Sequence, residues 1–246
     1  MSKIFDAYRK SVENNLADRV DVVPDLAREI SRAGSLQLFP YLLGNQAEEF
    51  RLLANRLLNM RIGQRGVVLA FASTSSGEGA SFVSYNAASA LANVYHQKVV
   101  WLDGNFLSPQ QKLKTSQQVS FSSLLQDPPQ AASLPKDQSP LLLPGGNNLI
   151  GARGLFADEQ YPKLLGILAS QFDFVIIDSP PVLNSTDTAL MVAETDGLLL
   201  VIEQKHLKYE VIQHGIQSLE EKGGKVMGTI INRRQFDLPK MIYDRL

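Results

Sequence analysis

Short apolar runs alternate with helical patterns along this chain, and that alternation restricts its possible folds more than any other feature. Each run ends in a polar or small residue, which is typical of strands buried on both faces of a parallel sheet. The runs occupy residues 67–72, 99–102, 174–177, 197–202 and 226–231. Helical patterns between them occupy residues 83–94, 161–168 and 212–219. We therefore expect an α/β fold with a mostly parallel sheet and helices on both of its faces.

The segments outside this pattern are less regular. We expect residues 1–45 to form an N-terminal helical arm and residues 46–246 to form the α/β domain. Gly223-Gly224 can end the last helical pattern by supplying a left-handed cap. Residues 108–140 are rich in Gln, Ser and Pro, and we expect them to be loop-rich and partly mobile.

Charge and composition exclude several classes of protein. The 246 residues include 24 Lys and Arg against 25 Asp and Glu, so a nucleic-acid binder with a basic face is not expected. The chain has no cysteine, which excludes disulfides and thiolate metal sites, and its three scattered histidines disfavour a zinc site. No apolar run approaches the roughly 20 residues that span a bilayer, and the N-terminus lacks a signal-peptide core. We expect a cytoplasmic protein that meets the inner face of a membrane through a partner.

A turn rich in glycine and serine joins the first apolar run to the helix after it. Its sequence is Ser73-Thr74-Ser75-Ser76-Gly77-Glu78-Gly79-Ala80-Ser81-Phe82. Small residues let backbone N–H groups converge on phosphate oxygens, and the helix N-terminus adds a favourable potential. A Walker A loop has Lys and then Ser or Thr after its last glycine. Here Ala80 replaces the lysine, whereas Ser81 keeps the hydroxyl that can reach a Mg²⁺ ion.

Two aspartates follow the next buried runs. Asp103 comes directly after residues 99–102, and Asp178 comes directly after residues 174–177. The carboxyl ends of parallel strands form the edge where such sheets bind ligands. There the carboxylates can hold Mg²⁺, and one can orient a nucleophile. Either aspartate alone is equally compatible with a helix N-cap, but the two together favour a nucleotide-binding ancestry.

The ordered motifs resemble those of the bacterial tyrosine kinases of capsule and exopolysaccharide synthesis, a branch related to the MinD/ParA ATPases. The family loop Pro-Gly-Glu-Gly-Lys-Ser-Thr matches residues 76–82. The family motif Asp-Ala-Asp-Leu-Arg-Arg-Pro aligns with residues 103–109, and Asp-Thr-Pro-Pro aligns with residues 178–181. Together with residues 48–51 and 228–232, the resemblance covers most of the chain.

The resemblance implies a P-loop fold, roles for particular residues, and partners. It implies that Asp103 and Asp178 act in catalysis, and that Ser81 joins them in holding Mg²⁺. It also implies that ATP or ADP contacts the loop and an asparagine beside the adenine, that is Ser76, Gly77, Glu78, Gly79, Ala80, Ser81, Phe82 and Asn232. The implied partners are the cytoplasmic segment of a membrane polysaccharide co-polymerase and further copies of the chain.

The departures from the family pattern affect the phosphate chemistry. Ala80 replaces the loop lysine, Asn105 replaces the second aspartate of the middle motif, and Phe82 replaces a threonine. No Lys or Arg occurs between Arg65 and Lys98, so a compensating cation has to come from a distant segment such as Arg153 or Arg233. We expect binding of ATP, ADP and Mg²⁺ to be weak or absent, and phosphoryl transfer to suffer more than binding.

Three functions are compatible with this pattern. The leading hypothesis is a degenerate kinase that serves as a binding or regulatory module in exopolysaccharide synthesis or export. The first alternative is an active tyrosine autokinase that uses Ser81, Asp103 and Asp178 with a borrowed cation. The second is a MinD/ParA-like ATPase that positions cargo, for which the loop and the Ser179-Pro180-Pro181 turn are less typical.

Overall fold

The structure is a computed structural model that describes residues 45–60, 65–106, 119–137, 139–146, 154–203 and 208–233. The expected N-terminal arm lies outside the described residues, apart from its last residue, and so does Arg153. The boundary expected at residue 45 therefore stays a prediction.

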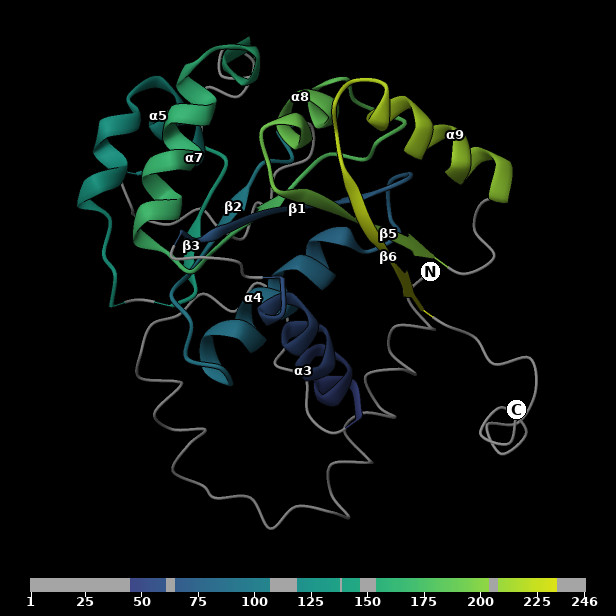
Figure 1. Ribbon diagram of the computed structural model, residues 1–246, viewed down its shortest axis with the longest axis horizontal. Coiled ribbons are helices and arrows are strands. Elements are labelled where there is room, and N and C mark those ends of the chain that lie inside the picture. The colour runs from purple at the N-terminus through teal and green to yellow at the C-terminus, as the bar shows by residue number, and fades with distance from the viewer. Residues whose placement is uncertain are drawn as a thin grey trace, which may run out of the picture. The chain divides into compact units, whose positions relative to one another are not determined.

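Within the described residues, six strands form one sheet in the order β3-β2-β4-β1-β5-β6 (Figure 1). All five pairings between neighbouring strands are parallel, so the expected α/β fold is confirmed. Five of the strands match the predicted apolar runs, and each extends one polar residue further. In chain order the strands are β1 Val67–Ser73, β2 Val99–Asp103, β3 Leu141–Leu143, β4 Phe174–Asp178, β5 Gly197–Glu203 and β6 Val226–Asn232.

Helices cover both faces of the sheet. Figure 1 shows α3 and α4 on one face and α5, α7, α8 and α9 on the other. None of the described helices is long and apolar enough to cross a membrane. The helices are α3 Asn45–Leu58, α4 Ala80–Asn93, α5 Phe121–Gln126, α7 Gln160–Gln171, α8 Asp187–Ala193 and α9 Tyr209–Glu220, with 3₁₀ helices η2 Pro128–Ser133 and η3 Gly154–Ala157.

Alternate residues of the central strand β1 enter separate cores on the two faces. Leu69 and Phe71 pack with α3 and α4. Val68 packs with α5 and α7, and Ala70 and Ala72 pack with α8 and α9. Because both faces of the strand are buried, its sequence is continuously apolar rather than alternating. The sheet is thus a rigid base for the groups at its ends.

The prediction of a loop-rich segment over residues 108–140 is wrong for the part that forms α5 and η2, and the edge strand β3 follows directly after the segment. Ser120 and Ser123 form a capping box at the start of α5, with the Ser123 N–H donating to Ser120 Oγ at 3.2 Å. Pro128 begins η2, where its missing N–H costs nothing. The serines and prolines that suggested a loop are therefore signals that start two short helices.

The predicted glycine cap after α9 is confirmed. Gly223 has a φ of 86°, in the left-handed region. The N–H of Gly224 donates to the carbonyl of Leu219 at 2.9 Å, and the N–H of Gly223 donates to that of Glu220 at 3.0 Å. These bonds satisfy two carbonyls of the last helical turn and direct the chain into β6.

Candidate functional site

One edge of the sheet collects polar groups, because five strands end there in a polar residue. These residues are Ser73, Asp103, Asp178, Glu203 and Asn232. Since all the strands run in one direction, their carboxyl ends share the edge at which α/β sheets bind ligands. The phosphate loop, residues 74–79, leaves β1 at this edge and leads into α4. The structure therefore brings together the predicted loop, both aspartates and Asn232.

The backbone of the phosphate loop needs glycine at two positions. Gly77 and Gly79 have φ values of 92° and 95°, which side chains of L-residues rarely adopt. A Cβ on Gly79 would also collide with the side-chain amide of Asn232. Gly79 is the N-cap of α4 and provides no side-chain cap. The first turn of α4 therefore begins at the loop without a capping side chain of its own.

Ala80 occupies the position at which a Walker A loop has lysine. It is the first residue of α4 and is buried, with 6% of its surface exposed. Its side chain belongs to the apolar core between the sheet and α4. No residue from 66 to 97 is Lys or Arg. The loop and α4 therefore carry no positively charged side chain.

Glu78 turns its carboxylate inward and ties the loop together. Its side chain is fully buried, and its Oε2 accepts the Ser75 N–H at 2.8 Å. Its Oε1 accepts the N–H of Glu203, the last residue of β5, at 3.5 Å. Its backbone carbonyl accepts the Asn232 side-chain amide at 2.8 Å. The two backbone donors compensate the buried charge, and the Glu203 N–H and the Asn232 amide fasten the loop to the ends of β5 and β6.

Asp103 and Asp178 lie side by side on the other flank of the loop. They are in register on the neighbouring strands β2 and β4, and both are fully buried. Burial raises the pKa of Asp178 well above its ordinary value, and the Asp103 carboxylate raises it further. The Ser81 side chain acts in the opposite direction and lowers this pKa. Neither carboxylate oxygen of Asp178 has a hydrogen-bond partner of good geometry.

A divalent cation fits this flank. Hard cations such as Mg²⁺ bind carboxylate and hydroxyl oxygens, and Ser81, Asp103 and Asp178 supply both kinds. A cation would satisfy the two buried oxygens of Asp178 and reverse the repulsion between the aspartates. The described residues contain no group of three or more His, Cys, Asp or Glu side chains placed to hold a metal. The remaining ligands would therefore be water and the oxygens of a bound phosphate.

Phe82 points into the core rather than forming a wall of the loop. Its ring meets that of Phe50 on α3 edge-on, with centroids 5.8 Å apart. Ser76, also predicted to contact the ligand, is exposed at the tip of the loop. The ligand-binding roles of these residues stay predictions.

Trp101 connects β2 to the first turn of α4. Its indole Nε1–H donates to Ser84 Oγ at 3.0 Å, and that hydroxyl donates to the carbonyl of Ser81 at 3.1 Å. Trp101 is fully buried and lies two residues before Asp103. The chain of bonds fixes Ser81 relative to the strand that carries Asp103.

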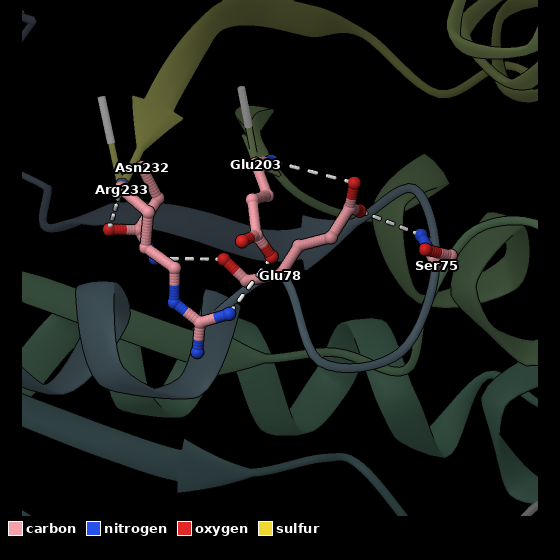
Figure 2. Close-up of polar contacts among 5 residues, drawn as sticks. All are labelled: Ser75, Glu78, Glu203, Asn232 and Arg233. Atoms are coloured by element: carbon pink, nitrogen blue, oxygen red, sulfur yellow. Dashed lines mark hydrogen bonds and ion pairs between the residues drawn. The ribbon is translucent and has the colours of Figure 1, made fainter. Parts of the chain in front are cut away.

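Two residues of the site were not predicted as such: Glu203 was not expected there at all, and Arg233 was expected only as one distant cation. Figure 2 shows both beside the loop residue Glu78. Arg233 Nη1 donates to Glu203 Oε2 at 2.9 Å, and the Arg233 N–H donates to Asn232 Oδ1 at 2.9 Å. Glu203 carried the same signal as the aspartates, because it too is the polar residue that ends a buried apolar run.

Comparison with known proteins gives a consistent set of relatives. No protein-family model matches the chain. The chain is 24% identical over 179 residues to tyrosine-protein kinase CpsD of Streptococcus agalactiae, a match that covers 70% of this chain and 77% of CpsD. It is 25% identical over 190 residues to tyrosine-protein kinase wzc of Salmonella typhi, covering 75% of this chain and 26% of wzc.

Solved structures share the fold. The crystal structure of the chimerical protein CapA2B2 matches with a TM-score of 0.68 and 23% identity, over 78% of this chain and 87% of that one. A ParA family ATPase from Chlorobium tepidum matches with a TM-score of 0.57 and 15% identity, over 73% of this chain and 79% of that one. The described domain therefore has the P-loop NTPase-like fold of these proteins.

Proposed function

Since these matches make the chain a homologue of the bacterial tyrosine-protein kinases, we propose that it is a degenerate kinase, used as a binding or regulatory module in exopolysaccharide synthesis or export. It keeps the scaffold and the cation-binding oxygens of a kinase. It lacks the charge that phosphoryl transfer needs.

The observation that carries this proposal is the absence of a cation from the phosphate loop. Ala80 is buried in apolar surroundings, and no Lys or Arg lies between residues 66 and 97. A charged hydrogen bond is typically worth about 1.5–3 kcal/mol, which is roughly ten- to hundredfold in affinity. The transition state of transfer carries charge on its equatorial oxygens, so it loses more stabilisation than the bound ground state.

The side of the loop next to β2 and β4 keeps groups that suit a bound nucleotide. Ser81, Asp103 and Asp178 would hold Mg²⁺, which would neutralise phosphate charge when bound. The glycines of the loop leave its backbone free to approach phosphate oxygens. Asn232 lies against Gly79, at the end of the loop nearer β6. These residues support a site that binds weakly and orients its ligand, with the chemistry of transfer removed.

The proposed setting follows from the relatives. We place the protein in the cytoplasm, at the inner face of the membrane when it docks on the cytoplasmic segment of a membrane polysaccharide co-polymerase. Association with further copies of the chain is part of the same proposal. Nucleic acid is not among the proposed partners, because positive and negative side chains are nearly balanced at 24 and 25.

The experiment is incubation of the full chain with labelled MgATP, followed by mass spectrometry for phosphotyrosine and an assay of released phosphate. We expect neither product from the wild type. Ala80→Lys should restore the loop cation and tighten MgATP binding by roughly ten- to hundredfold, whereas the neutral control Ala80→Gln should not. Turnover by the wild type at a rate typical of kinases would overturn the proposal.

One observation favours the second candidate, an active autokinase: Ser81, Asp103 and Asp178 converge as catalysis would require. That function predicts phosphotyrosine on the wild type and its loss in Asp178→Asn. A positioning ATPase of the ParA type would instead dimerise with ATP, which size-exclusion chromatography with and without MgATP detects.

A further inference from the structure

Arg233 directly follows β6, and its backbone conformation is unusual. Its φ of 51° is in the left-handed region, which is uncommon for a residue with a side chain. The Asn232 side-chain oxygen accepts its N–H at 2.9 Å and supports this conformation. Its side chain remains 58% exposed although Nη1 binds Glu203. The guanidinium therefore keeps further N–H donors accessible to a ligand.

Both partners of Arg233 contact the phosphate loop directly. Asn232 donates its amide to the Glu78 carbonyl at 2.8 Å, and the Glu203 N–H lies 3.5 Å from Glu78 Oε1. Figure 2 shows how the two place Arg233 beside Glu78. Among the ion pairs of the described residues, the other arginines, Arg51 and Arg65, pair with Glu48 and Asp196. Of the three arginines in these ion pairs, Arg233 is therefore the one whose partners contact the phosphate loop.

The strand order puts Arg233 on the flank of the loop opposite the aspartates. Asp178 ends β4, the loop follows β1, and Arg233 follows β6, which is two strands beyond β1. With neighbouring strands about 4.8 Å apart, the backbones of Asp178 and Arg233 are separated by roughly 14 Å. A phosphorylated ligand on the loop would lie between them. It would meet the cation-binding oxygens on one side and a guanidinium on the other, so a phosphoryl group would lie beside Arg233 where the family resemblance places the adenine beside Asn232.

We infer that Arg233 is the phosphoryl-binding cation of this chain and that a phosphorylated ligand on the loop takes its guanidinium from Glu203. The ligand class is a nucleotide or polyphosphate, whose common feature is a phosphoryl group. The inference rests on the proposed function and deepens it. It assigns to Arg233 the positive charge that binds the phosphoryl group. This charge lies on the flank away from Ser81, Asp103 and Asp178, whose oxygens phosphoryl transfer would use.

The exchange of partners is favourable on physical grounds. In the Arg233–Glu203 pair the arginine side chain is 58% exposed and the glutamate side chain 25%, and ion pairs in contact with solvent contribute little. Arginine binds phosphate through two parallel N–H bonds, a stronger arrangement than a single bond to a carboxylate. Glu203 is held in place by its own backbone bond to Glu78, so it stays behind when the guanidinium moves. Glu203 therefore competes with the ligand for Arg233.

Isothermal titration of the full chain with MgADP and with magnesium pyrophosphate tests the inference through two variants that should act in opposite directions. Arg233→Gln removes the ligand's partner and should weaken binding of both probes by roughly ten- to hundredfold. Glu203→Gln removes the competing carboxylate and should tighten binding of both. A purely structural bridge between β5 and β6 would make both variants weaken binding.

A matched control separates this contact from a general loss of positive charge. Lys225 is exposed and precedes β6 at the opposite end of the sheet. Lys225→Gln changes the net charge by the same amount as Arg233→Gln and should leave both affinities unchanged. Arg233→Lys should retain part of the affinity, because it keeps the charge but not the paired donors. Thermal unfolding midpoints show whether each variant is folded.

The outcomes are distinct from those of the kinase assay. Three results would each overturn the inference. The wild type could bind neither probe, or Arg233→Gln and Lys225→Gln could have equal effects. Arg233→Gln could also lose MgADP binding while its pyrophosphate binding is unaffected. Those results would leave the proposed loss of transfer intact. Conversely, phosphotyrosine on the wild type would overturn the proposed function, while the opposed effects of the Arg233 and Glu203 variants would still support the inference.

Discussion

The two flanks of the phosphate loop differ in how their charged groups are compensated. On the β2–β4 flank, Asp103 and Asp178 are fully buried, and the oxygens of Asp178 have no well-placed partner. On the β5–β6 flank, Glu78, Glu203 and Arg233 are joined in one series of hydrogen bonds. On the β2–β4 flank, hereafter the open flank, an external cation would satisfy the Asp178 oxygens. The β5–β6 flank, hereafter the closed flank, compensates its charges within the chain.

The largest effect should come from Glu78, which is the centre of the closed flank. Glu78→Ala leaves the Ser75 N–H without its acceptor and should reduce the free energy of unfolding by about 2–3 kcal/mol. Urea unfolding measures the loss. Glu78→Gln, which keeps a side-chain oxygen, should lose less. A change no greater than that of the exposed control Glu221→Ala would show that the two flanks are not different in kind.

The open flank should gain stability when its charge is removed. The raised pKa means that folded Asp178 holds its proton more tightly than the unfolded chain, so stability falls as the pH rises above the ordinary value of 3.8. Asp178→Asn should therefore stabilise the metal-free protein at pH 7, by at least about 1 kcal/mol, and should flatten its pH dependence.

Mg²⁺ gives the converse test of the open flank. The ion should raise the unfolding midpoint of the wild type at pH 7 and should have little effect on Asp178→Asn. Differential scanning fluorimetry across pH with and without Mg²⁺ measures both changes. If Asp178→Asn destabilises the metal-free protein at pH 7, the carboxylate is satisfied in a way that contradicts the comparison.

The smallest effect should be that of the Arg233–Glu203 pair on stability. The two side chains are 58% and 25% exposed, so Arg233→Gln should cost less than about 1 kcal/mol of unfolding free energy. Added salt should reduce the difference. Urea unfolding at two ionic strengths measures it. A cost above that of Glu78→Ala would identify Arg233 as a structural rather than a ligand-binding residue.

The sheet and the open flank could be predicted from the sequence, since a buried strand leaves a continuous apolar run and its terminal polar residue marks the functional edge. Asp103 and Asp178 were found in this way. Their register could not be, because it requires β2 and β4 to be neighbours although β3 lies between them in the chain. The short strand β3 was missed because three apolar residues carry no distinct period.

The closed flank was largely invisible to sequence reasoning. Its contacts join residues as far apart as Glu78 and Asn232, and they depend on a left-handed backbone at Arg233. No local pattern specifies such a conformation for arginine. The negative charge of Glu78 is plain in the sequence, but the structure shows that its carboxylate is buried and accepts backbone N–H groups. The sequence thus shows that a charged side chain is present at a site more readily than it shows which way that side chain points.

The two hydrogen bonds that link Trp101 through Ser84 to the start of α4 make this tryptophan an intrinsic fluorescent probe of the loop. The chain contains a single tryptophan, and it is shielded from solvent. Its tryptophan emission, excited selectively over the seven tyrosines, therefore comes from one position, linked by hydrogen bonds to the turn that carries Ser81. Changes in emission wavelength or lifetime can follow occupancy of the loop without a dye, an added fluorophore or an engineered residue.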